Sequence, residues 1–163
     1  MRDFRGRCAY SLQHVEIVGS KSMEIDHFNP TLKGSARHEY RNLFPAVHHC
    51  NNFKRAIWPT SSEMKAGLRF LNCCEEQDYG VHIFENPDTH ELVGITPEGR
   101  YHIDGCDLNA PHFVRERRER SQLRDLLEKY AVHVQGEIAE ARDLIQKLRQ
   151  NVGLMIPPVP APP

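Results

Sequence analysis

The residues best suited to chemistry are Asp26 and His27, in the stretch MEIDHFNP. They end a short run in which apolar and polar residues alternate, directly before a turn-forming Asn-Pro pair. Neighbouring side chains of a regular strand point to opposite faces, so a strand that breaks here can bring both side chains to one site. An imidazole has its pKa near working pH and can act as a general base, and a carboxylate is a hard oxygen ligand for a metal ion.

Two asparagines follow at the spacing D-H-x14-N-x8-N. Asn42 stands before the short apolar pair Leu43-Phe44, which predicts a second strand. Asn51 lies in a segment that we interpret as a helix, because apolar residues recur there at steps of four, three and four: Ala46, Cys50, Phe53 and Ile57. Lys54 and Arg55 then lie on the same helix face as Asn51. The predicted order is strand, loop, strand, helix.

This arrangement is suited to phosphodiester cleavage, which requires an activated water, charge neutralisation at phosphorus and help for the leaving oxygen. We expect neutral His27 to activate the water. Asp26 and Asn51 offer oxygen ligands to Mg²⁺ or Mn²⁺, and such an ion stabilises the leaving oxygen. Lys54 and Arg55 have few acidic neighbours, so we predict that they contact phosphate.

These motifs resemble the HNH endonuclease family, whose fold is the ββα-metal finger. The resemblance rests on Asp26-His27, on Asn42, and on Cys50-Asn51 with Lys54 three residues later. It covers roughly residues 8–58 and implies that His27 is the general base and that Asp26 and Asn51 hold the metal. It also implies that Asn42 braces the loop that carries the catalytic histidine. The last motif position is Asn rather than His, a variant that the family uses.

Many relatives of this kind also carry two C-x-x-C pairs that bind a structural zinc ion. Here each pair has lost one cysteine, because the pairs read Cys8-Ala9-Tyr10-Ser11 and Val47-His48-His49-Cys50. A tetrahedral zinc site needs four nitrogen or sulfur ligands. Either Cys8 and Cys50 recruit a histidine or a distant thiol, or the zinc is lost and both cysteines pack as small apolar residues.

The rest of the chain divides by composition. After the core at 1–60, residues 61–110 start with a helix signal at Thr60-Ser61-Ser62-Glu63 that Leu68 and Leu71 continue. Three short alternating runs, VHIF, ELVGI and RYHI, then predict a β-hairpin or meander. Residues 111–150 predict a long amphipathic helix with an apolar stripe from Leu123 to Leu148, and 151–163 are a proline-rich tail. The expected fold class is α+β: an HNH-type ββα core, a hairpin extension and a long C-terminal helix.

Charge is distributed unevenly over these segments. Residues 1–60 carry nine Lys or Arg against five Asp or Glu, whereas 61–110 carry three against ten. The first third is therefore the expected place for an anionic partner such as DNA. The arginines between 115 and 124 alternate with acidic residues, which favours a salt-bridged helix face over a DNA contact.

The stretches RFLNCCEEQDYGVHIF and IDGCDLNAPHFVRERRER are similar to those of small bacterial HNH proteins in anti-phage and restriction operons, such as the Septu nuclease subunit. This resemblance implies a role in degrading invading DNA. It also implies a partner protein, such as an ATPase of the same system. The apolar stripe predicts docking of a partner or a homodimer.

Bulk features narrow the alternatives. The five cysteines, an odd number, argue against a closed disulfide framework, and no apolar run reaches the ~18 residues of a membrane span. We therefore expect a cytoplasmic protein with no membrane contact. Besides the nuclease, two readings remain open: a non-catalytic nucleic-acid-binding or scaffold subunit that docks a partner through its C-terminal helix, and a structural zinc module.

Overall fold

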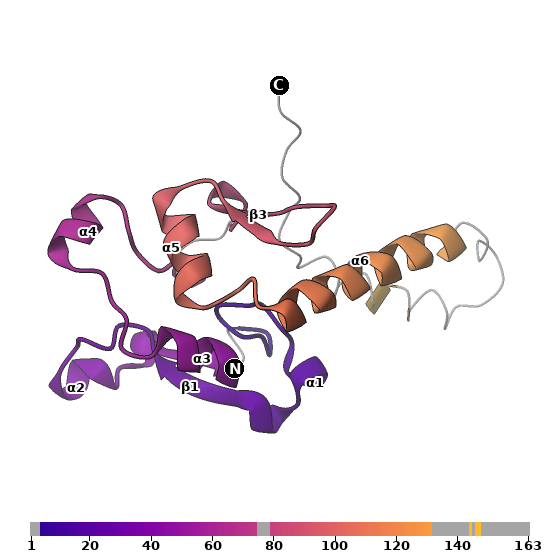
Figure 1. The fold of residues 1–163 in the computed structure, drawn as a ribbon. Helices are drawn as coiled ribbons and strands as arrows, with labels where there is room; N and C mark the ends of the chain where they lie inside the picture. Colours follow the sequence, from indigo (N-terminus) through magenta and orange to yellow (C-terminus); the bar gives the residue numbers. More distant parts are fainter. Residues whose placement is uncertain (1–3, 75–78, 132–143, 145, 148–163) are drawn as a thin grey trace.

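The protein is described by a computed structural model, in which residues 4–74, 79–131, 144, 146 and 147 are placed. It has the expected α+β composition, with two separate two-stranded antiparallel sheets and a set of helices (Figure 1). The first sheet with its helix lies at one side of the molecule, and the second sheet lies beside α5 and the start of the long helix α6.

The first third forms a strand–strand–helix unit. β1 (Met23–His27) pairs with β2 (Leu43–Val47), so that Asp26 lies opposite Phe44. α3 (His48–Lys54) follows β2 directly and packs across both strands. The helix predicted around Asn51 is therefore confirmed, but it is short.

The apolar face that we predicted for this helix is wrong in part. Ala46 belongs to β2, while Phe53 and Ile57 are 48% and 44% exposed. The buried face is formed by Cys50 and Lys54, which lie four residues apart and therefore on the same side of the helix.

The segment before β1 contacts the strand–strand–helix unit at β2. It contains α1 (Val15–Val18) and a 3₁₀ turn at Ser20–Ser22. The amide of Ala9 donates to the carbonyl of Pro45 at 2.8 Å, and Phe4 packs edge-on against Phe44. The strands are thus joined to the N-terminal segment as well as to each other.

The loop between β1 and β2 holds α2 (Gly34–Arg37) and a 3₁₀ turn at Tyr40–Asn42. Phe28 begins this loop and is fixed by aromatic contacts with Phe44 and Trp58. The exit from β1, just after His27, is thus attached to the core.

The helix start predicted at Thr60 is confirmed. Thr60 and Glu63 form a reciprocal capping box at α4 (Ser61–Lys65). The helix ends at Lys65, since Gly67 has a φ of +87°, so Leu68 and Leu71 lie beyond it. Leu71 is instead a buried core residue.

Of the two predicted alternatives, the β-hairpin is confirmed, and the three-stranded meander is wrong. After a 3₁₀ turn at Tyr79–Val81, β3 (Ile83–Glu85) pairs with β4 (Leu92–Gly94), but RYHI lies in α5 (Pro97–Gly105). Thr96 caps this helix and Pro97 occupies its first turn, two start signals that outweigh the short alternation. A Cβ atom at Gly99 would lie 2.2 Å from the carbonyl oxygen of His82, so this helix approaches the hairpin through a residue without a side chain.

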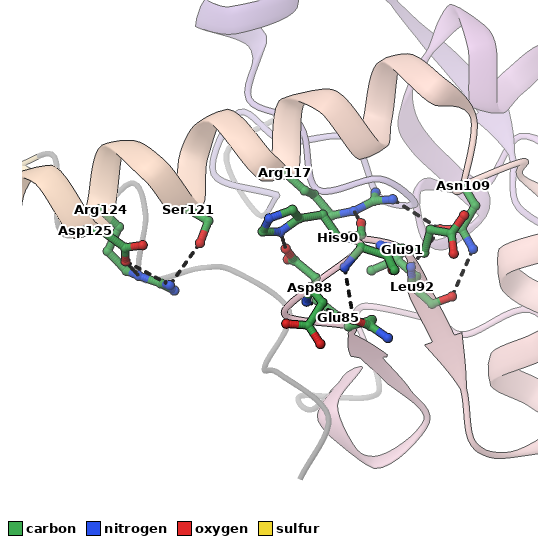
Figure 2. Close-up of polar contacts among 12 residues, drawn as sticks. Glu85, Asp88, His90, Glu91, Leu92, Asn109, Arg117, Ser121, Arg124 and Asp125 are labelled. Carbon is green, nitrogen blue, oxygen red and sulfur yellow. Dashed lines mark hydrogen bonds and ion pairs between the residues drawn. The ribbon is translucent and has the colours of Figure 1, made fainter. Parts of the chain in front are cut away.

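α6 (Pro111–Ala131) is attached to the hairpin by a buried arginine (Figure 2). The Arg117 guanidinium donates to the His90 carbonyl at 2.7 Å and to Asn109 Oδ1 at 3.1 Å. Asn109 in turn bonds both backbone groups of Leu92, at 2.7 and 2.9 Å. Burial lowers the pKa of Arg117 to about 10.

Other arginines of α6 form the predicted salt bridges. Arg120 pairs with Glu116, and Arg115 lies at the limit of pairing with Glu119. Beyond Ala131 the predicted helix to 150 and the proline-rich tail lie outside the described residues, apart from isolated positions. Among the helices that the structure describes, none is long and apolar enough to cross a membrane.

Candidate functional site

His27 ends β1 and faces His38, the residue that caps α2. The two rings meet edge to face, with 3.4 Å between His27 Nε2 and His38 Nδ1. His27 is half-buried and His38 is exposed. Partial burial, followed by the positive charge of Arg37, lowers the pKa of His27 below 6.5. A neutral imidazole, the form that a general base requires, is therefore favoured at neutral pH.

Asn42 holds the loop that follows His27. Its side chain is 5% exposed, its Oδ1 accepts from the Asn29 amide at 2.7 Å, and its Nδ2 donates to the carbonyls of Asn29 and Arg37 at 3.2 and 2.9 Å. Its own carbonyl accepts from the Phe28 amide at 2.9 Å. One buried amide thus joins both ends of the loop between His27 and His38, which is the bracing position that the resemblance implies.

Asp26 lies on the opposite side of β1 from His27, in the interior. Its Oδ2 is 2.8 Å from Lys54 Nζ and also accepts a hydrogen bond from the Tyr10 hydroxyl. Lys54 is fully buried, donates to the His27 carbonyl at 3.1 Å and lies over the rings of Tyr10 and Phe70. Lys54 is thus held in the core by Asp26 and cannot reach a phosphate on the surface, contrary to our prediction.

Asn51 lies half-buried on α3, and Arg55 comes directly after that helix. Asn51 Nδ2 donates to Glu24 Oε2 at 2.6 Å, and the other oxygen of Glu24 lies 2.6 Å from His48 Nδ1. These two bonds lower the pKa of Glu24. Arg55 follows the last helical residue and is exposed, so it remains the candidate for phosphate contact from the predicted pair.

The cysteines of the two altered C-x-x-C pairs meet in the core. Cys8 Sγ accepts from the backbone amides of Tyr10, Ser11 and Val47, each at 3.4 Å. Burial alone would raise the pKa of Cys8, but hydrogen bonds from Cys50 and Ser11 lower it to about 6. Both thiols have 0% exposure. Their contacts fit the reading in which they pack inside the protein.

The metal ligands that we predicted do not fit an ion in the arrangement described. In the described part of the chain, no group of three or more His, Cys, Asp and Glu side chains is arranged to hold a metal. The ammonium of Lys54 takes the place of a cation at Asp26, and Asn51 turns its amide to Glu24. Asp26 and Asn51 are therefore each engaged by a different partner.

Reasoning from sequence missed Tyr10, the burial of Lys54 and the contact between His38 and His27. Tyr10 and the burial of Lys54 carry no local signal, apart from the spacing of Lys54 four residues after a buried cysteine. The contact of His38 with His27 depends on the path of the loop, which no local pattern specifies.

Comparisons with protein-family models, with curated proteins and with solved structures found no match.

Proposed function

We propose that this chain is an HNH-type endonuclease that hydrolyses phosphodiester bonds in DNA, with His27 as the general base. The observation that carries the proposal is a half-buried imidazole of lowered pKa at the end of β1, next to a loop held by Asn42. The order β1, β2, α3 supports it, because it is the order that the motif requires.

The roles of the chain's own residues follow from their positions. His27 accepts a proton from the attacking water, and the positive charge of Arg37 favours its neutral form. Arg55 is exposed at the end of α3 and contacts a phosphate of the backbone. Asn42 positions the loop, and Lys54 fixes the His27 peptide through its carbonyl.

Dependence on Mg²⁺ or Mn²⁺ is part of the proposal, and such an ion would act as a Lewis acid on the phosphate. Because Asp26 and Asn51 are engaged by Lys54 and Glu24, no step of the cleavage is assigned to a bound ion.

A partner protein is proposed at α6. Leu123, Leu126 and Tyr130 are 42%, 50% and 55% exposed along this helix, and exposed apolar side chains at helical spacing suit a docking surface. This observation also supports the second candidate, a non-catalytic scaffold subunit, and it fits a component of an anti-phage or restriction system.

The deciding experiment compares the wild-type chain with His27→Ala on supercoiled plasmid, with Mg²⁺, with Mn²⁺ and with EDTA. We expect metal-dependent nicking that falls by ~10²–10⁴-fold in the variant, the contribution of a general base. His48→Ala is the matched control, since this histidine is exposed on α3 and faces Glu24. Cleavage by His27→Ala within a few-fold of the wild type would remove His27 from the reaction, and a folded, inactive wild type would favour the scaffold.

A further inference from the structure

The hydrogen bond between the rings of His27 and His38 is a long one. The nitrogens are 3.4 Å apart, whereas N–H···O hydrogen bonds have a mode of ~2.9–3.0 Å. Nevertheless the two nitrogens face each other across an edge-to-face pair whose ring centres are 5.2 Å apart. The two ring nitrogens are therefore close together but only weakly bonded to each other.

Both separations match two imidazoles that converge on one tetrahedral ion. With a metal–nitrogen bond of ~2.0–2.1 Å, the nitrogens of such a pair lie ~3.3 Å apart and the ring centres ~5.2 Å apart. We propose that His27 Nε2 and His38 Nδ1 together bind a transition metal ion such as Zn²⁺ or Ni²⁺. Imidazole nitrogen suits these ions, whereas Mg²⁺ and Mn²⁺ prefer oxygen.

The pair is held in place before any ion arrives. His27 is fixed by strand pairing and by the Lys54 ammonium on its carbonyl. The His38 amide bonds to Ser35 at 2.9 Å, and the preceding carbonyl, that of Arg37, is bonded by Asn42. Preorganised ligands reduce the entropy lost on binding.

The surroundings set the strength of the site. Besides His38 itself, three charged side chains act on His27: Asp26, which attracts a cation, and Arg37 and Lys54, which repel one. Lys54 is paired with Asp26 at 2.8 Å, so the uncompensated charge is that of Arg37. The exposed ring of His38 gives an ion access from solvent, and water fills the remaining coordination positions. We therefore assign a reversible site of moderate affinity, weaker than a closed structural zinc site.

One consequence rests on the proposed function. An ion bound to His27 Nε2 takes the lone pair that would accept the proton of the attacking water. Zn²⁺ would then inhibit cleavage supported by Mg²⁺, and the inhibition would depend on His38. The binding itself does not depend on any activity.

The test follows the histidine rings directly, by long-range proton–nitrogen NMR spectra of the full-length protein during titration with ZnCl₂. In the wild type, the signals of His27 and His38 should respond together. In His38→Gln, a change at an exposed position, the His27 response should need at least about tenfold more zinc, because the second ligand no longer acts within the molecule. His48→Gln is the matched control and should leave the His27 response unchanged.

Two results would overturn the site: a His27 signal in His38→Gln that responds at the wild-type zinc concentration, or no response of either ring in the wild type. A parallel assay measures plasmid nicking in Mg²⁺ with added ZnCl₂, where His38→Gln should resist inhibition. If the protein cleaves no DNA, the proposed function fails, while the NMR titration still decides the metal site.

Discussion

Lys54 Nζ lies 2.8 Å from Asp26 Oδ2, and both side chains are inside the protein, at 0% and 5% exposure. The pair connects the end of β1 to the end of α3. The Tyr10 hydroxyl binds the same carboxylate, so the N-terminal segment shares this junction. The acidic residue next to His27 thus has a structural partner that the motif alone does not reveal.

Replacing Lys54 by Met should lower the free energy of unfolding substantially. The change leaves the Asp26 carboxylate buried without its cation, and breaking a buried ion pair in this way costs about 3–5 kcal/mol. Urea denaturation followed by circular dichroism measures the loss in free energy of unfolding.

Arg55→Met is the matched control, because Arg55 is the next residue and is exposed; it should change stability by no more than about 0.5 kcal/mol. The double change Asp26→Asn with Lys54→Met should recover part of the loss. Equal effects of the Lys54 and Arg55 changes would contradict the buried pair.

Asn42→Ala should destabilise the loop between β1 and β2. The change leaves the Asn29 amide without its 2.7 Å acceptor and two carbonyls without a donor, a loss of about 1–3 kcal/mol for buried groups. The stability of Asn42→Asp should lie between those of the wild type and Asn42→Ala, since aspartate keeps the acceptor but removes the donor. The control is Asn52→Ala, at an exposed asparagine of α3, which should have little effect on stability. Hydrogen exchange at the Asn29 amide measures how readily the loop opens.

Cys8→Ala should cost more stability than Cys106→Ala. Both thiols have 0% exposure and both changes remove the same atoms, but Cys8 Sγ accepts from three backbone amides. The difference between the two variants in thermal or urea unfolding therefore isolates those bonds, and it should be about 1–3 kcal/mol. Equal losses would mean that the thiol of Cys8 serves only as packing.

Stability should fall as pH drops below 6.5, in part through His112. Burial, followed by the nearby ring of His49, lowers the pKa of His112. The unfolded chain therefore takes up a proton at a higher pH than the folded one, so the stabilisation is complete above 6.5 and is lost as pH falls toward the lower, folded pKa. His112→Gln should reduce the dependence of the unfolding free energy on pH, measured by denaturation at pH values between 7.5 and 5.5. An unchanged pH dependence would mean that other groups cause it.

Arg55→Gln should weaken DNA binding equally at all sequences. A phosphate contact releases about one counterion, so the slope of log affinity against log salt should become shallower by about 1. Fluorescence anisotropy with a labelled duplex at several salt concentrations measures this slope, and Lys65→Gln on α4 is the control. An unaltered slope would place the phosphates elsewhere.

The strand–strand–helix order was predictable from sequence, because a run of alternation, a turn at Asn29-Pro30 and an apolar pair leave few other arrangements. The burial of Lys54 was not, since a lysine is rarely buried and its acidic partner lies 28 residues earlier. The pairing of Asn51 with Glu24 was missed for a related reason. It depends on the register of α3 over β1, which no local pattern specifies.

The downstream segments show a second kind of limit. RYHI alternates like a strand but forms a helix, because four residues are too few for periodicity to outweigh a Thr-Pro start signal. Arg117 was grouped with the exposed arginines of α6, yet it bonds the hairpin through His90 and Asn109 (Figure 2). Only the position of the hairpin distinguishes it from its neighbours.

Asn42 holds the loop between β1 and β2 at Asn29 and at Arg37, while the stretch between these points carries the exposed side chains of Thr31, Lys33 and Ser35. Residues can therefore be inserted or exchanged there without moving His27. In a nuclease, such a stretch would let substrate preference change through evolution or grafting while the reacting histidine stays where it is.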